Sequence, residues 1–130
     1  MTYFHPSIVS DKLVPTINFY EDYFDFIPVI EEAGFTLLRR LGKSDERIAI
    51  YDAAHKCVEG RVQLVRGVIL NMAVDDVQAA YDALYMEGLE IYKEPGTDIH
   101  GRKHFVVYDP NGILVNVHEA VDVAPPMELA

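Results

Sequence analysis

The clearest pattern in the chain is a pair of runs in its last third in which apolar and polar residues alternate. These runs cover residues 102–108 and 113–119, and residues 109–112, with the sequence Asp-Pro-Asn-Gly, lie between them. Proline sets φ for the first half of a tight turn, while asparagine and glycine tolerate the positive φ values of the second half. The pattern therefore predicts an antiparallel β-hairpin.

The same order of elements is predicted twice along the chain. In the first half, a strand at 7–10 precedes a helix with Pro15 in its first turn, and strands follow at 26–32, 35–40 and 47–51. In the second half, a strand at 68–74 precedes a helix that Asp75 or Asp76 caps and Gly88 ends, and strands follow at 89–92, 102–108 and 113–119. Two βαβββ modules, at about 3–54 and 67–121, are therefore expected within one domain of residues 1–130, with a C-terminal tail at 122–130.

Composition restricts the class of protein and its partners. Half of the 130 residues are apolar, and Cys57 is the only cysteine, so one core can form without disulfides. The formal net charge of -10 repels nucleic acid and anionic membrane surfaces. No charged-then-apolar leader is recognised at the N-terminus. We therefore expect a soluble cytoplasmic protein with no nucleic-acid or membrane partner.

Several motifs in this order are similar to those of one large family. They are Phe19-Tyr20 late in the first helix, Val-Asp-Asp-Val at 74–77, and Asp-Pro-Asn-Gly at 109–112 before the last strand. With the two βαβββ modules, the chain resembles the vicinal oxygen chelate superfamily, which includes glyoxalase I, extradiol dioxygenases and bleomycin-resistance proteins. The resemblance implies an α+β fold in which the modules form an open, curved mixed sheet around a cleft. It also implies a homodimer.

The resemblance implies positions for metal ligands, and the residue types at these positions are unsuitable. The family's glutamate on the last strand falls at Asn116, and its histidine on the first strand of the second module falls at Ile69. On the first strand of the chain, the same counting reaches Phe4, with His5 one residue away. An asparagine amide is a poor ligand for transition metals, and isoleucine has no donor atom. We therefore expect a cleft without a metal ion or other cofactor.

Strand alternation predicts which side chains line the cleft instead. On strand 68–74, Ile69 and Asn71 lie on the face away from the helices, and on the last strand Asn116 and His118 lie on that same face. Pairing across the predicted turn places Phe105 close to Asn116. Apolar walls with a few neutral polar groups suit a small organic molecule, although each asparagine could instead satisfy a neighbouring backbone group. The predicted ligand-binding residues are Ile69, Asn71, Phe105, Asn116 and His118.

Three functions are compatible with these observations. The first is sequestration of a small organic molecule, as in the antibiotic-resistance branch of the family, and the acidic charge favours a cationic or aromatic ligand. The second is a lyase, isomerase or dioxygenase that depends on a divalent metal ion, bound by His5, His118 or Glu119 in a shifted register. The third is an interaction or regulatory module without a ligand.

Overall fold

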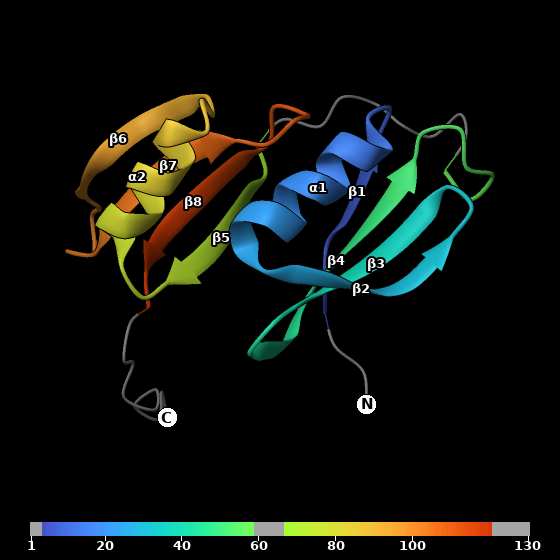
Figure 1. The fold of residues 1–130 in the computed structure, drawn as a ribbon, viewed down its shortest axis with the longest axis horizontal. Coiled ribbons are helices and arrows are strands. Elements are labelled where there is room, and N and C mark those ends of the chain that lie inside the picture. The colour runs from blue at the N-terminus through green and yellow to red at the C-terminus, as the bar shows by residue number, and fades with distance from the viewer. Residues whose placement is uncertain (1–3, 59–66, 121–130) are drawn as a thin grey trace. The chain divides into compact units, whose positions relative to one another are not determined.

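The chain folds into two compact units. A computed structural model describes residues 4–58 and 67–120 (Figure 1). The first unit comprises Met1–Gly67 with Asp109–Gly112, and the second comprises Val68–Tyr108 with Ile113–Ala130. The predicted tail at 122–130 lies outside the described residues. The boundary between the two units, between Gly67 and Val68, lies where the second module was predicted to start.

The first unit is a βαβββ module with a four-stranded mixed sheet in the order β1-β4-β3-β2. Strand β1 runs parallel to β4, and the other neighbours are antiparallel. The predicted elements are confirmed, except that the last strand begins four residues earlier than expected. The elements are β1 (Ser7–Ser10), α1 (Leu13–Phe24), β2 (Phe26–Glu32), β3 (Phe35–Arg40) and β4 (Lys43–Asp52).

The second unit repeats this order, with its strands arranged β5-β8-β7-β6. Its elements are β5 (Ile69–Val74), α2 (Val77–Met86), β6 (Ile91–Thr97), β7 (Lys103–Tyr108) and β8 (Leu114–Glu119). Strands β5 and β8 are parallel, and the other pairs are antiparallel. The repeated βαβββ order and the two mixed sheets confirm the predicted α+β fold.

Both sheets end in a strand with a proline and irregular pairing. Strand β2 contains Pro28, and its register with β3 shifts between Pro28 and Ile30. Strand β6 contains Pro95, and its register with β7 shifts twice between Ile91 and Gly96. Strand β6 continues to Thr97, so the prediction that this strand ends at Tyr92 is wrong. An edge strand tolerates proline because the side of its backbone that faces away from the sheet needs no hydrogen bond within it.

Each helix presses large side chains onto one face of its own sheet. In the first unit, Phe19, Tyr20 and Phe24 of α1 are buried, and the rings of Phe19 and Tyr20 meet edge to face at 5.0 Å. In the second unit, Val77 and Leu84 of α2 are buried, and the Tyr81 ring contacts the Phe105 ring at 5.4 Å. Burial of these apolar faces is the main driving force for packing helix on sheet. Neither helix of the described residues is long and apolar enough to span a membrane.

The Asp-Pro-Asn-Gly turn is held within the first unit by a buried hydrogen-bond network. The Tyr20 hydroxyl donates to Asp109 Oδ2 at 2.9 Å, and the backbone N–H of Asn111 donates to Asp109 Oδ1 at 2.7 Å. The Asn111 amide donates to Thr16 at 3.0 Å and accepts from the Ser10 hydroxyl. Burial raises the pKa of Tyr20 well above its usual value, and the Asp109 charge adds to this effect. Tyr20 therefore remains a hydrogen-bond donor to the carboxylate.

Candidate functional site

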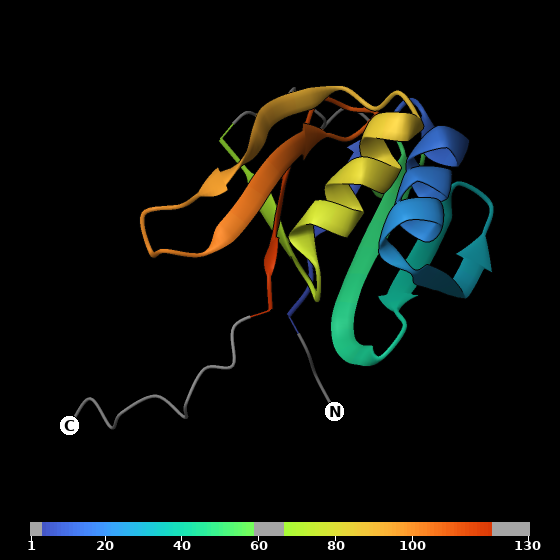
Figure 2. The same ribbon diagram turned by 60° about the vertical axis from the view of Figure 1, so that its left-hand side comes forward.

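The second sheet has an apolar face and a polar face. Helix α2 covers the apolar face, where Phe105, Val115 and Val117 are fully buried (Figure 2). Cross-strand partners lie on the same face of a sheet, so the pairs Asn71–Asn116 and His104–His118 share the opposite face. We call these four residues the polar face. It brings together three of the predicted site residues, Asn71, Asn116 and His118.

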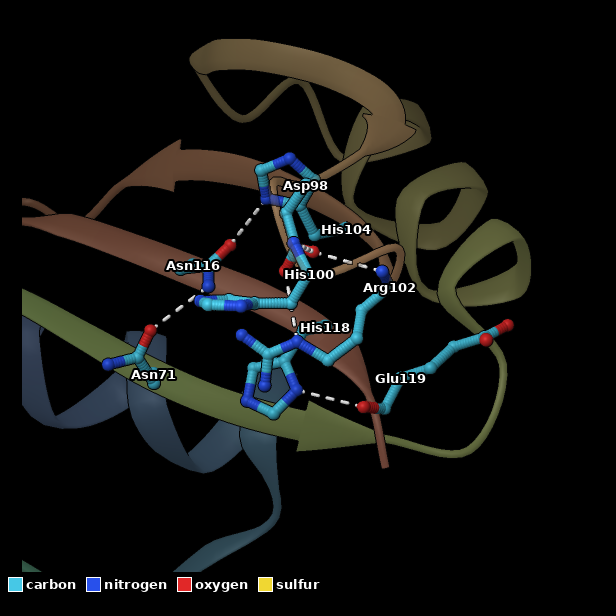
Figure 3. A network of polar contacts seen from close by, with 8 residues as sticks. All are labelled: Asn71, Asp98, His100, Arg102, His104, Asn116, His118 and Glu119. Atoms are coloured by element: carbon cyan, nitrogen blue, oxygen red, sulfur yellow. Dashed lines mark hydrogen bonds and ion pairs between the residues drawn. The ribbon is translucent and has the colours of Figure 1, made fainter. Parts of the chain in front are cut away.

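Three side chains of the polar face form a hydrogen-bonded chain with a defined direction (Figure 3). The Asn116 amide donates from Nδ2 to Asn71 Oδ1 at 3.0 Å, and its Oδ1 lies 2.8 Å from His104 Nδ1. Because that oxygen can only accept, His104 Nδ1 carries the proton of this bond. Both ends of the Asn116 amide are therefore occupied, and the exposed Asn71 is left with its Nδ2 donors, which have no partner among the described residues.

His118 presents a hydrogen-bond acceptor on the same face. Its Nδ1 lies 2.8 Å from the backbone carbonyl of Glu119, and a carbonyl oxygen can only accept, so Nδ1 carries a proton. In the neutral ring, Nε2 then has a free lone pair. The polar face thus offers donors at Asn71 and an acceptor at His118, which is half-buried.

A tight turn between β6 and β7 is closed by one carboxylate. Asp98 accepts hydrogen bonds from the backbone N–H groups of His100 and Arg102 at 2.8 and 2.9 Å, and it pairs with Arg102 Nε at 2.9 Å (Figure 3). The backbone hydrogen bond from Arg102 is the largest of the effects that lower the pKa of Asp98 to about 2. The pair holds the Arg102 guanidinium at the turn.

This turn predicts a pH-dependent contribution to stability. Because the folded-state pKa of Asp98 lies below the usual value of about 3.9, its charge stabilises the fold above about pH 4, and this stabilisation is lost as the pH falls toward 2. We expect Asp98→Asn to have a lower free energy of unfolding than the native protein near neutral pH. The difference between the two should shrink as the pH falls from about 4 toward 2. Urea unfolding at a series of pH values measures it. A difference that stays constant down to about pH 2 would contradict the prediction.

The predicted placement of Phe105 is wrong. Strand β7 pairs with β8 so that Tyr108 faces Leu114, and the loop between the strands is one residue longer than the sequence interpretation assumed. A slip of one residue moves every side chain of a strand to the other face. Phe105 consequently packs beneath α2 with no exposed surface, and His104 takes the place beside Asn116.

His104 is the residue of the polar face that sequence reasoning missed. The sequence does hold a signal for it, because residues that pair across two strands tend to be alike in polarity. In the observed register the apolar Phe105 and Val107 lie opposite the apolar Val117 and Val115, and His104 lies opposite His118. The other predicted positions agree with the structure. Ile69 is about half exposed, at 53%, and pairs with Leu114 on the same side of the sheet as the polar face. Whether these residues bind a ligand stays a prediction.

The residues at the implied ligand positions do not fit a metal centre. The Asn116 oxygen is engaged by His104, and Ile69 offers no donor atom. Phe4 and His5 precede β1, which begins at Ser7. Among residues 4–58 and 67–120, no three or more histidine, cysteine, aspartate or glutamate side chains come together as metal ligands.

The alternative ligands on β8 point to different sides of the sheet. His118 lies on the polar face, whereas Glu119, the next residue, points toward the side of α2 (Figure 3). There Glu119 lines an open hollow of about 260 Å³ at the start of the helix, together with Asp76, Gln78 and Lys103. Asp76 already caps the helix by accepting from the Ala79 N–H at 3.0 Å. Neighbouring residues of a strand point to opposite faces in any register, so a shifted register of β8 does not bring His118 and Glu119 into one site.

Comparison with solved structures supports the fold. The chain is similar to an integron cassette protein from the mobile metagenome of V. cholerae, at 23% identity and a TM-score of 0.70 over 93% of this chain and 96% of that one. A glyoxalase-related enzyme from Fulvimarina pelagi is 16% identical, with a TM-score of 0.73 over 92% and 89% of the two chains. A bleomycin-binding protein in complex with bleomycin is 19% identical, with a TM-score of 0.66 over 93% and 100%.

Sequence comparison places the chain in one superfamily. No curated protein sequence matches it. The sequence model described as Glyoxalase/Bleomycin resistance protein/Dioxygenase superfamily matches residues 2–117, which is most of the chain and includes both βαβββ modules. The resemblance found in the motifs is thereby confirmed, and the chain belongs to the Glyoxalase/Bleomycin resistance protein/Dioxygenase superfamily.

Proposed function

We propose that this protein binds a small organic molecule on the polar face without a metal ion and acts by sequestration. The observation that carries the proposal is the state of Asn116, whose amide oxygen accepts from His104 and whose nitrogen donates to Asn71. A neutral amide with both ends engaged orients other groups and does not supply the anionic oxygen that a divalent metal prefers. The fold shared with a bleomycin-binding protein supports this function.

The groups left free on the polar face suggest how a ligand is held. Asn71 offers N–H donors to a carbonyl, ether or hydroxyl oxygen, and His118 Nε2 offers an acceptor to an N–H or O–H group. Ile69 and Leu114 lie beside them and supply apolar contact. The net charge of -10 raises the local concentration of cations, which supports a cationic or aromatic ligand.

A metal-dependent lyase, isomerase or dioxygenase is the second candidate. One observation favours it: His104 and His118 are direct cross-strand partners, and each has its Nδ1 in a hydrogen bond, the arrangement that orients metal-ligating histidines. The fold is also shared with a glyoxalase-related enzyme. This candidate requires a bound divalent metal ion. The homodimer implied by the resemblance stays a prediction under both functions.

The metal content of the protein separates these two functions. Protein purified without chelators or a metal-affinity tag is expected to contain no stoichiometric nickel, zinc, iron or manganese by elemental analysis, even after incubation with these ions. Metal-free bleomycin, a cationic and aromatic probe, is expected to bind in calorimetry. Asn71→Ala should weaken that binding by roughly fivefold to tenfold, because one hydrogen bond contributes about 1 kcal/mol.

A matched variant tests whether any such loss is local. Gln78→Ala removes an exposed side-chain amide from α2, away from the polar face, and should leave the affinity unchanged. Near-stoichiometric metal would contradict sequestration and favour the metal-dependent enzyme. Equal affinities for the native protein and Asn71→Ala would contradict the assigned contact.

A further inference from the structure

The ion pair of Asp98 and Arg102 lies on the same side of the second sheet as the polar face. Along β7, His104 belongs to the polar face, whereas its neighbour Lys103 and the cross-strand partner Thr97 line the hollow beside α2. The backbone N–H of Asp98 donates to the carbonyl of Arg102 at 2.8 Å, so these two residues form the next cross-strand pair of the same hairpin. Side chains alternate between the two faces along a strand. Asp98 and Arg102 therefore lie on the side of His104.

The turn encloses the carboxylate of this pair and leaves the guanidinium accessible. Asp98 accepts hydrogen bonds from the backbone N–H groups of His100 and Arg102 and from Arg102 Nε. The Asp98 side chain is only 12% exposed, whereas that of Arg102 is 33% exposed. A molecule on this side of the sheet therefore meets the cation of the pair. Because the turn holds Asp98 in place, the carboxylate also fixes Nε of Arg102 and limits the motion of the guanidinium.

Most of the hydrogen-bonding capacity of the Arg102 side chain is unused. A guanidinium has five N–H donors, and only the one on Nε has a partner among the residues that the structure describes. The two Nη groups are therefore free to donate to a ligand. Figure 3 shows that the guanidinium points from the turn toward the side where Asn71 and His118 lie. Paired N–H groups of arginine match the two oxygens of a carboxylate in spacing and charge.

We propose that the ligand of the polar face is an aromatic organic acid whose carboxylate accepts hydrogen bonds from the Nη groups of Arg102. Ile69, which is 53% exposed, and Leu114 lie on the same side of the sheet and contact the ring. The inference rests on the proposed function, because the ligand uses the same face, and it assigns the aromatic class and not the cationic one. The net charge of -10 is distributed over the chain, whereas Arg102 lies at the site, and charges more than about 10 Å away are largely screened at moderate ionic strength.

Calorimetry with three probes that share one ring tests the charge of the ligand. The probes are the anion indole-3-acetate, the neutral indole-3-acetamide and the cation tryptamine. We expect indole-3-acetate to bind at least about tenfold more tightly than each of the other two, and its affinity to fall as salt is added. Equal binding of indole-3-acetamide would overturn the contact with the carboxylate. Equal or tighter binding of tryptamine would overturn the sign of the charge.

A pair of variants assigns the preference for the anion to Arg102. Arg102→Gln is expected to weaken indole-3-acetate binding roughly tenfold and to remove its preference over indole-3-acetamide. Lys103→Gln makes the same change of charge at the next residue, whose side chain lies on the opposite face, and should leave the affinity within about twofold. Equal losses in the two variants would show a general effect of charge and would overturn the assignment to Arg102.

The ratio of two affinities separates binding by Arg102 from support of the turn. If Arg102 acted only by holding the turn with Asp98, then Arg102→Gln would weaken indole-3-acetate and indole-3-acetamide equally and keep the preference, which would overturn the proposal. Arg102→Lys keeps the charge and loses the two-pronged contact, so it should retain part of the preference for indole-3-acetate. Added indole-3-acetate should raise the unfolding temperature of the native protein more than that of Arg102→Gln.

Metal-free bleomycin, measured on the native protein in the same series, separates this inference from the proposed function. Binding of bleomycin together with a preference for indole-3-acetate is the expected result. Binding of bleomycin without that preference would overturn the role of Arg102 and leave sequestration on the polar face standing. If neither bleomycin nor any of the three indole probes bound, both the proposed function and this inference would be overturned.

Discussion

Replacing Phe105 by alanine is expected to destabilise the protein by about 3–5 kcal/mol, the usual cost of deleting a fully buried aromatic ring. Phe105 has no exposed surface, and its ring packs edge to face against Tyr81 of α2 at 5.4 Å. The substitution leaves a cavity between the helix and β7 that the surrounding side chains fill only in part. Urea unfolding followed by circular dichroism measures the loss.

Ile69→Ala is the matched control for this experiment. Ile69 is a predicted site residue that remains 53% exposed, so its truncation should cost less than about 1 kcal/mol. If Phe105→Ala also cost less than about 1 kcal/mol, then Phe105 would not lie in the core, and the register of β7 would be the one that the sequence first suggested. The pair of variants therefore tests the corrected register directly.

Replacing Asp109 by alanine is expected to cost about 3 kcal/mol or more, because hydrogen bonds to a charged group contribute about 1.5–3 kcal/mol each. Asp109 is buried, and its carboxylate accepts from the Tyr20 hydroxyl and from the backbone N–H of Asn111. Without the carboxylate, the Tyr20 hydroxyl is left buried with no acceptor. Thermal and urea unfolding measure the change.

Tyr20→Phe removes one contact of this network and keeps the charge. It should cost about 2 kcal/mol, less than Asp109→Ala, because the carboxylate retains its bonds to Asn111. In the double variant, the two losses should sum to more than the observed total, since both remove the same bond. Strictly additive losses would show that Tyr20 and Asp109 act independently, contrary to the 2.9 Å hydrogen bond.

The element order was predictable because local signals agree with the final packing. The Asp-Pro-Asn-Gly turn, the aspartate before α2 and the apolar spacing of α1 each specify a local structure that the fold retains. The extent of β6 was less predictable. Pro95 and Gly96 resemble a loop in sequence, and only the position of β6 at a sheet edge makes them compatible with a strand.

The candidate site was predictable only as far as strand alternation could reach. Alternation within β5 and β8 placed Asn71, Asn116 and His118 on one face correctly. The register between β7 and β8 depends on whether Ile113 belongs to the loop or to the strand, and the alternating pattern fits both choices. The direction of the hydrogen bonds from His104 through Asn116 to Asn71 depends on side-chain distances, which a sequence does not contain.

The prolines and register shifts at β2 and β6 affect how the protein behaves toward other copies of itself. A regular edge strand exposes a row of backbone donors and acceptors that can pair with a strand of another molecule, which is a common route to aggregation. Pro28 and Pro95 each remove one donor, and the shifts beside them distort the row. The charged side chains of Glu31 on β2 and Lys93 on β6 also oppose pairing, because they repel like charges on another molecule and remain hydrated. Intermolecular sheet growth is therefore disfavoured at the β2 edge of the first sheet and at the β6 edge of the second.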